Sequence, residues 1–300
     1  ALYLLAIVGL PLMIALLAVK LGETLSASQL GILVVLALLP ASEIAISLVN
    51  RMVSERWEPA TLPGMALRSG VPESAATALV MPVLLSGEAE IDQMVRRLEV
   101  HFLSNSEDNL VFALLSDWSD ADTETKPDDA RLLAYAYDQI AALNRTHPSG
   151  KPRFHLLHRH RQWNAAQGKW MGWERKRGKL HEFNRLLRGA TDTSFLDPEE
   201  FQKATSTNIR YVITLNADTR LPRGAAKKLI GKMAHVLNAP SVTYGRVVEG
   251  YGIMQPRVTP SLPIGGTGSL FQWAFSGPNG LDPYAFAVSA VYQDLFEQGS

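Results

Sequence analysis

Short apolar runs alternate with amphipathic stretches along most of this chain, and this alternation constrains its fold more than any other feature. The order strand, helix, strand, helix is typical of a mostly parallel sheet with helices on both faces. The sequence therefore predicts an α/β fold. The expected strands are residues 78–83, 110–115, 153–158 and 211–215, with a further one at 251–256. Helical spacing of apolar residues predicts helices at 88–102, 128–144 and 174–188, and one carrying Leu229, Ile230, Met233 and Leu237.

The first 50 residues have a different character. Residues 1–19 contain no charged side chain, and residues 30–49 contain one, Glu43. About 20 apolar residues are enough to cross a bilayer as a helix. We therefore expect two transmembrane helices, with the lipid bilayer as a partner. A signal peptide fits less well, because it has a basic start and a shorter apolar region.

The expected domain boundaries follow from this contrast. Residues 1–50 form the two spans, residues 51–76 a linker broken by prolines and glycines, and residues 77–300 the α/β domain. Arg51 and Arg56 follow the second span directly. Because basic residues gather on the cytoplasmic side of membranes, we expect the α/β domain to be cytoplasmic.

Composition excludes several classes of site. The net charge is zero and the isoelectric point is near 7.3, which gives no reason to expect nucleic acid as a partner. Cysteine is absent, so disulfides, thiolate metal sites and a cysteine nucleophile are excluded.

Polar side chains follow the strands of the predicted sheet. The run that starts at Tyr211 ends in Asn216-Ala217-Asp218. In open α/β sheets, ligands bind at the carboxyl ends of the strands. The amide of Asn216 and the carboxylate of Asp218 can both reach one hard divalent cation, Mg or Mn. The alternative is a strand followed by an Asx-type turn.

The loops after the other strands add candidates at the same edge. Ser86 follows the first strand and Asp117 the second, and the third leads to a basic helix start with Lys176, Arg177, Gly178 and Lys179. A carboxylate and a cation-rich helix start suit a metal-bound diphosphate, and Gly178 permits close backbone approach to a ligand. The alternatives are a helix or turn cap for Asp117 and a solvated face for the basic run.

Several longer strings resemble one known family, the cyclic β-1,2-glucan synthases. They are Val71-Pro-Glu-Ser74, Trp170-Met-Gly-Trp-Glu-Arg-Lys-Arg-Gly-Lys-Leu180, Tyr211-Val-Ile-Thr-Leu215, Val248-Glu-Gly-Tyr-Gly-Ile-Met-Gln-Pro-Arg257, Asp282-Pro-Tyr284 and Val291-Tyr-Gln-Asp-Leu-Phe296. The resemblance implies a multi-pass enzyme of the bacterial inner membrane with a cytoplasmic glycosyltransferase domain of GT-A type. It would transfer glucose from UDP-glucose, with a divalent metal, to a growing protein-linked β-1,2-glucan that is later cyclised. Further transmembrane helices and a C-terminal phosphorylase-like domain are implied as well.

The resemblance also assigns roles to residues. Asp117 would hold the uridine, Lys176, Arg177 and Lys179 would face the diphosphate, and Asp218 would ligate the metal; Ser86 and Gln255 are further candidates for substrate binding. The family has an aspartate at the position of Asn216, so one negative charge is lost here and metal binding should weaken.

Two further expectations concern the reaction. The general base and the acceptor motif of the family are expected beyond Ser300. The rival interpretations are another processive membrane synthase of cellulose type, and a membrane assembly subunit whose catalytic site has decayed.

Overall fold

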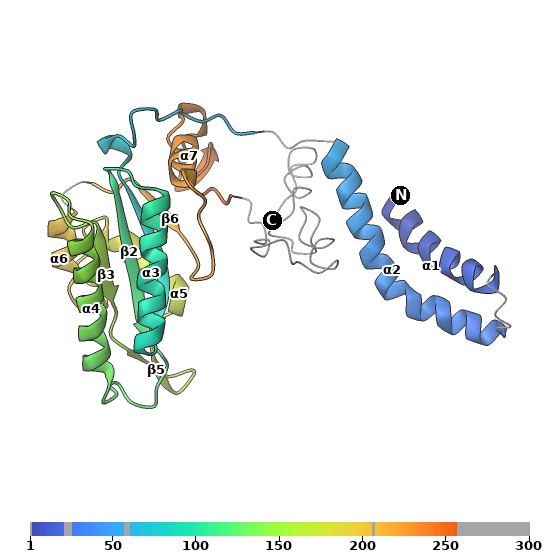
Figure 1. The fold of residues 1–300 in the computed structure, drawn as a ribbon, viewed down its shortest axis with the longest axis horizontal. Helices are drawn as coiled ribbons and strands as arrows, with labels where there is room; N and C mark the ends of the chain where they lie inside the picture. The colour runs from blue at the N-terminus through green and yellow to red at the C-terminus, as the bar shows by residue number, and fades with distance from the viewer. Residues whose placement is uncertain (1, 21–25, 57–60, 206–207, 257–300) are drawn as a thin grey trace. The chain divides into compact units, whose positions relative to one another are not determined.

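A computed structural model describes residues 2–20, 26–56, 61–205 and 208–256 of the chain (Figure 1). The chain divides into two compact units, residues 1–62 with 253–300 and residues 63–252. The helices are α1 Leu2–Lys20, α2 Ala27–Arg56, α3 Glu88–Ser104, α4 Asp129–Thr146, α5 Arg175–Leu186, α6 Pro198–Ala204 and α7 Ala225–Met233, with 3₁₀ turns η1 Glu73–Ala75 and η2 Val236–Asn238. The strands are β1 Thr77–Leu85, β2 Leu110–Trp118, β3 Phe154–His158, β4 Gln162–Asn164, β5 Lys169–Met171, β6 Tyr211–Thr214, β7 Ser241–Thr243 and β8 Arg246–Glu249.

A four-stranded sheet forms the centre of residues 63–252. Its order is β3-β2-β1-β6 and every neighbouring pair is parallel. β1 pairs with β2 along its whole length, and β6 lies on the other side of β1. The chain therefore reverses its direction of strand addition at β1, and such a switch point opens a crevice at the carboxyl ends of the strands.

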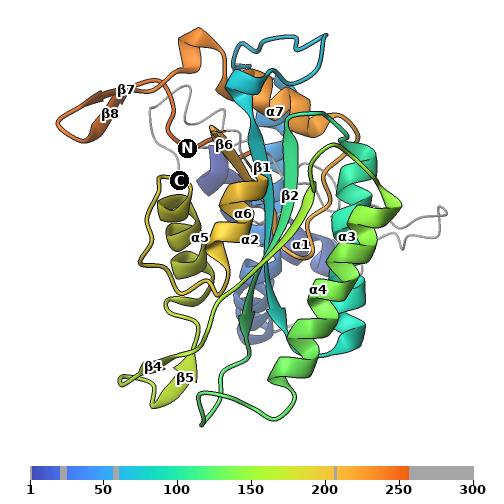
Figure 2. The same cartoon turned by 90° about the vertical axis from the view of Figure 1, so that its left-hand side faces the viewer.

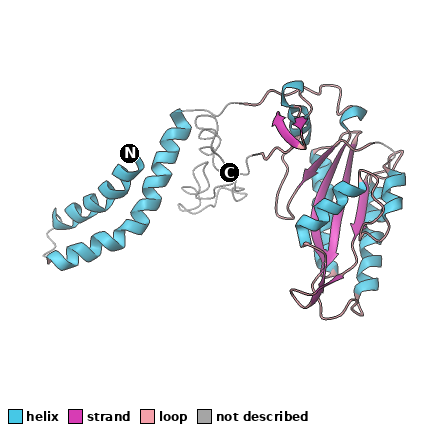
Figure 3. Ribbon diagram, turned by 180° about the vertical axis from the view of Figure 1, so that it is seen from behind, coloured by secondary structure: helices cyan, strands magenta, loops and turns pink. Residues whose placement is uncertain are grey.

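Helices cover both faces of this sheet (Figures 2 and 3). On β1, Leu79 and Met81 pack into the apolar cluster that includes α3, α4 and α7, whereas Ala78 and Val80 pack into the cluster that includes α5 and α6. Alternate residues of a strand point to opposite faces, so a strand buried on both sides reads as a continuous apolar run. The prediction of an α/β fold with a mostly parallel sheet flanked by helices is confirmed.

Two details of the predicted fold are wrong. Residues 251–256 form no strand; instead β7 and β8 form a hairpin just before them, turned by Tyr244 and Gly245 with φ of 51° and 75°. Leu237 does not continue the helix of Ile230, because α7 ends at Met233 and the 3₁₀ turn η2 leaves Leu237 74% exposed. A strand requires a paired edge, which the local sequence does not specify.

Residues 1–62 contain two apolar helices, α1 and α2. Pro11 lies within α1 and Pro40 within α2. Within the described ranges, no helix taken singly has the length and apolar character needed to cross a bilayer. The segments Ala27–Leu38 and Pro40–Ile46, bent by 44°, meet that criterion together by length and composition. α2 also extends to Arg56, six residues into the stretch expected to be a linker.

Candidate functional site

Asp117 lies at the carboxyl edge of the sheet, where β2 ends beside Leu84 of β1. It is 2% exposed. Arg159, the first residue after β3, is completely buried and binds both of its carboxylate oxygens, with Nε 2.7 Å from Oδ1 and Nη2 3.0 Å from Oδ2. A bidentate guanidinium fixes the plane as well as the position of a carboxylate.

Two residues of α5 complete this arrangement. The Lys179 ammonium lies 3.0 Å from Oδ2 of Asp117 and donates to the backbone oxygen of Val83 at 2.6 Å. Glu182 accepts from Nη1 of Arg159 at 3.0 Å, and its second oxygen accepts from the backbone and hydroxyl of Ser194 at 2.7 and 2.6 Å. We call Asp117, Arg159, Lys179 and Glu182 the buried charge cluster. Its two cations and two carboxylates balance in charge.

The cluster connects elements that are far apart in sequence. It joins β1, β2, the end of β3 and the inward face of α5. Burial lowers the pKa of Lys179 to about 8, and the neighbouring Asp117 carboxylate opposes this shift. Lys179 is thus held as a cation by its partner rather than by solvent.

Two glycines allow the backbone to close over the cluster. A Cβ on Gly172 would lie 2.6 Å from Cγ of Asp117 and 2.9 Å from Nη2 of Arg159. A Cβ on Gly178 would lie 2.0 Å from the backbone oxygen of Trp173. The close approach expected at Gly178 is therefore made by the protein's own chain, where the loop turns into α5.

The loop after β6 meets the start of α5 at the same edge. The Lys176 ammonium contacts the side-chain oxygen of Asn216. Asn216 and Asp218 are both exposed, and the turn between them is closed by a hydrogen bond from Thr219 N to Asn216 O of 3.0 Å. We call Lys176, Asn216 and Asp218 the rim. It lies beside the switch point between β1 and β6.

The remaining predicted residues lie as follows. Arg177 is exposed and pairs with Glu174 at 2.9 Å. Ser86 is exposed directly after β1. Gln255 is exposed and belongs to the unit made of residues 1–62 and 253–300, so it is not placed relative to the rim.

The metal-binding potential of the rim rests on two side chains. Within the described ranges, no three histidine, aspartate or glutamate side chains gather as a metal site. Asn216 and Asp218 are both exposed, and the amide oxygen of Asn216 is in contact with the Lys176 ammonium, which a bound cation would have to displace. Mg²⁺ is commonly held by one or two carboxylates together with substrate phosphates and water. The donor set fits a cation that arrives with a diphosphate.

Three residues of the site were not predicted from the sequence: Arg159, Glu182 and Gly172. A usable signal exists for Glu182, because it shares one face of α5 with Lys179, Phe183 and Leu186 at helical spacing. Charged residues on such a face indicate a buried pair. Arg159 stands in a polar run after β3 and carries no comparable signal.

Two histidines of β3 are also buried. The Nδ1 of His158 lies 2.8 Å from the Ser116 hydroxyl, and its ring packs edge-on against Trp118 at 4.3 Å. Burial lowers the pKa of His158 to about 3 and that of His155 to about 4. Both rings are therefore neutral at physiological pH.

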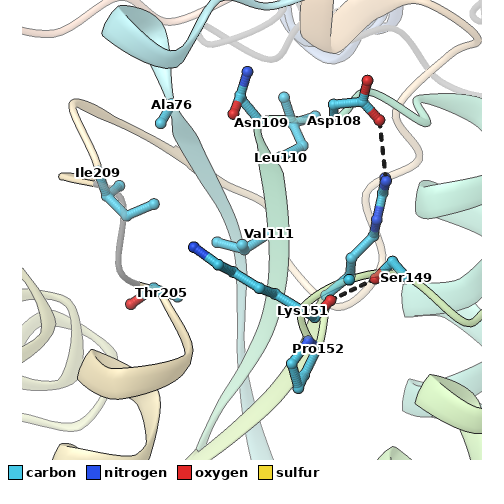
Figure 4. A pocket seen from close by; sticks show the side chains of 12 residues that line it. Ala76, Asp108, Asn109, Leu110, Val111, Ser149, Lys151, Pro152, Thr205 and Ile209 are labelled. Carbon is cyan, nitrogen blue, oxygen red and sulfur yellow. Dashed lines mark hydrogen bonds and ion pairs between the residues drawn. The ribbon is translucent and has the colours of Figure 1, made fainter.

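A pocket of about 330 Å³ lies at the opposite edge of the sheet (Figure 4). It is lined by the starts of β2 and β3, with Lys151 and with Arg153 paired to Asp108 at 3.1 Å. It contains none of the cluster or rim residues. We therefore assign no part of the chemistry to it.

Comparison with known proteins identifies the relationship of the chain. No family model matches it. The chain is 48% identical over 272 residues to cyclic beta-(1,2)-glucan synthase NdvB of Rhizobium meliloti (strain 1021). The match covers 90% of this chain and 10% of that protein, so the chain spans about a tenth of the relative's length. The resemblance to the cyclic β-1,2-glucan synthases is thereby confirmed: the chain is similar to a segment of one of them.

Proposed function

We propose that this chain carries the donor-binding part of a membrane-bound inverting glucosyltransferase. The enzyme would transfer glucose from UDP-glucose to a growing protein-linked β-1,2-glucan that is later cyclised. The observation that carries the proposal is the contact between Lys176 and Asn216, because it joins the basic helix start to the loop after β6. The relationship to a cyclic glucan synthase supports the choice of product.

Each part of the site would have a distinct task. Lys176 and Arg177 are exposed cations at the start of α5 and would meet the diphosphate. Asp218, with Asn216, would hold the divalent cation, Mg or Mn, which would stabilise the charge that grows on the leaving UDP. Asp117 would face the uridine, with Ser86 as a further contact to the substrate.

The buried charge cluster sets a condition on two of these roles. Asp117 and Lys179 are each 2% exposed and bonded to one another. A direct contact between either residue and a ligand therefore requires displacement of a bonded partner. The cluster would otherwise serve the site from behind, by fixing the end of β2 against α5 so that the exposed Lys176 keeps its position.

The setting of the domain is part of the proposal. The apolar helices α1 and α2 would anchor it to the bacterial inner membrane, facing the cytoplasm. The general base, the motif that holds the reacting end of the acceptor, further membrane helices and a phosphorylase-like domain would be supplied by the rest of the full-length protein.

The test is the variant Asp218→Ala in the full-length enzyme, with transfer of labelled glucose from UDP-glucose as the assay. We expect transfer to be abolished while the protein remains folded. Asp192→Ala is the matched control, because Asp192 is an exposed aspartate paired with Arg185 at the far end of α5. Glucan synthesis by Asp218→Ala at the control's rate would refute the role of Asp218.

Asn216→Asp tests the rival interpretation of a decayed subunit. The added carboxylate would strengthen metal binding. We expect metal-dependent UDP-glucose binding in the native protein and tighter binding in the variant. Absence of binding in both proteins would favour a non-catalytic assembly subunit. Linkage analysis of the product distinguishes β-1,2-glucan from the product of a cellulose-type synthase.

A further inference from the structure

Two tryptophans stand opposite each other on a small hairpin at the carboxyl edge of the sheet. β4 and β5 are antiparallel, and Trp163 is paired directly with Trp170. Their ring centroids are 5.8 Å apart and their planes are inclined at 57°. Trp163 is 52% exposed, whereas Trp118 at the end of β2 is 7% exposed. We call Trp163 and Trp170 the tryptophan pair.

The hairpin is fixed to the rest of the domain at both ends. Arg161, just before β4, is buried and donates to the backbone oxygens of Ser119 at 2.9 Å and Glu124 at 3.0 Å. Met171, at the end of β5, is 3% exposed. The exposed Trp163 and the half-buried Trp170 are therefore held on an anchored support, so that a ligand would not have to order them.

The hairpin is also bonded to the loop that follows β2. Trp170 exchanges two backbone hydrogen bonds with Ala121, of 2.9 and 2.8 Å, four residues beyond Asp117. Among its charged neighbours, Lys169 pairs with Asp122 and Arg175 with Asp120. The surface around the tryptophan pair thus combines apolar rings with compensated charge.

This chemistry suits a neutral oligosaccharide. A glucose ring in the β configuration has an apolar face of C–H groups, and indole offers a large, rigid apolar surface with a donor at its edge. The two planes face in different directions, and a chain that curves toward ring closure can meet both. A charged partner such as a nucleotide would need uncompensated charge, which the paired side chains around the hairpin do not offer.

We infer that the tryptophan pair is a binding surface for the growing glucan chain, which packs its sugar rings against Trp163 and Trp170. This inference rests on the proposed function for the identity of the glucan. A cross-strand tryptophan pair also stabilises a hairpin by itself. That role alone leaves unexplained why about half of the Trp163 surface faces solvent on a hairpin already anchored at both ends.

The first test uses the native chain and β-1,2-linked gluco-oligosaccharides. N-bromosuccinimide oxidises accessible indoles, and peptide mapping locates the oxidised residues. We expect the oligosaccharides to protect Trp163 from oxidation, and an isomeric β-1,4-linked series to protect it less. Protection of an indole by a ligand is a readout that a purely structural role would not produce.

The second test measures affinity in variants of the same chain. We expect Trp163→Ala to weaken oligosaccharide binding by about tenfold or more, and Trp163→Phe to weaken it less, because a smaller aromatic face remains. Val236→Ala is the control, since Val236 is an apolar side chain that is 79% exposed in the turn η2, outside the hairpin. Thermal unfolding of each variant verifies that the fold is retained.

Any one of three results would overturn the inference. The first is absence of oligosaccharide binding at millimolar concentration, and the second is equal binding by Trp163→Ala and the native chain. The third is protection of Trp163 by lipid vesicles or by self-association instead of by sugar. Loss of UDP-glucose binding with intact oligosaccharide binding would instead refute the proposed function and leave this surface standing. The two failures are thus distinguishable.

Discussion

Arg159 is the residue on which the buried charge cluster most depends. Its guanidinium makes two hydrogen bonds to Asp117 and one to Glu182, and its side chain has no exposed surface. The substitution Arg159→Met keeps much of the apolar stem and removes the charge. Two buried carboxylates then remain beside a single cation, Lys179, whose ion pair is with Asp117.

The magnitude follows from the burial of these partners. Removing one partner of a buried ion pair costs about 3–5 kcal/mol, because the remaining charge cannot regain its hydration. With an m value of about 2–3 kcal/mol/M, the urea midpoint of residues 63–252 should fall by about 1–2.5 M. Arg185→Met is the control. Arg185 binds Asp192 on an exposed face, where solvent screens the pair, so its midpoint should hardly change.

The assay is urea unfolding of the purified chain, monitored by tryptophan fluorescence, since Trp118 is buried next to Asp117. The urea midpoint of Arg159→Lys should lie between those of the native chain and Arg159→Met. An ammonium keeps the charge but lacks the planar guanidinium that binds both carboxylates. Equal midpoints for Arg159→Met and Arg185→Met would refute the reasoning and would mean that the cluster is open to water.

Two further predictions concern stability. The folded-state pKa values of His155 and His158, about 4 and about 3, lie below the usual 6.5, so their contribution to stability is complete above pH 6.5 and is lost as the pH falls toward those values. At pH 5.5 the loss should be about 1.4 kcal/mol for each histidine, and a pH series of urea midpoints in the native chain and His155→Phe should show a shallower decline in the variant. Gly178→Ala should destabilise the fold by about 1–3 kcal/mol, since its Cβ would collide with the backbone of Trp173, whereas Gly150→Ala, which meets nothing within 4 Å, should be neutral in the same assay.

The strands and helices were predictable where the signal is local. The runs that became β1, β2, β3 and β6 are apolar on both faces, and the helices show their inward residues at regular spacing. Strand order is a different matter. Nothing in the run from Tyr211 specifies that it pairs with β1 rather than with β3, because pairing depends on how the helices fill the two faces.

The candidate site divides in the same way. Asp117, Asn216 and Asp218 stand directly after apolar runs, so their place at the carboxyl edge follows from chain order. Their environments do not. Asp117 is enclosed because Arg159 arrives from the next strand and Gly172 closes over both, and each of these contacts is long-range.

Lys176 and Lys179 are one helical turn apart, yet one is exposed at the rim and the other is buried against Asp117 and Val83. Lys179 of α5 and Arg159 after β3 both bind Asp117. Rotation of α5 to exchange the two lysines would therefore break the buried charge cluster. A ligand at the rim therefore meets Lys176 in a position set by charges that the ligand itself need not touch. Substitutions in the cluster should accordingly weaken binding of the proposed donor even where no cluster atom contacts it, and substitutions at Lys176 should weaken this binding without unfolding the domain.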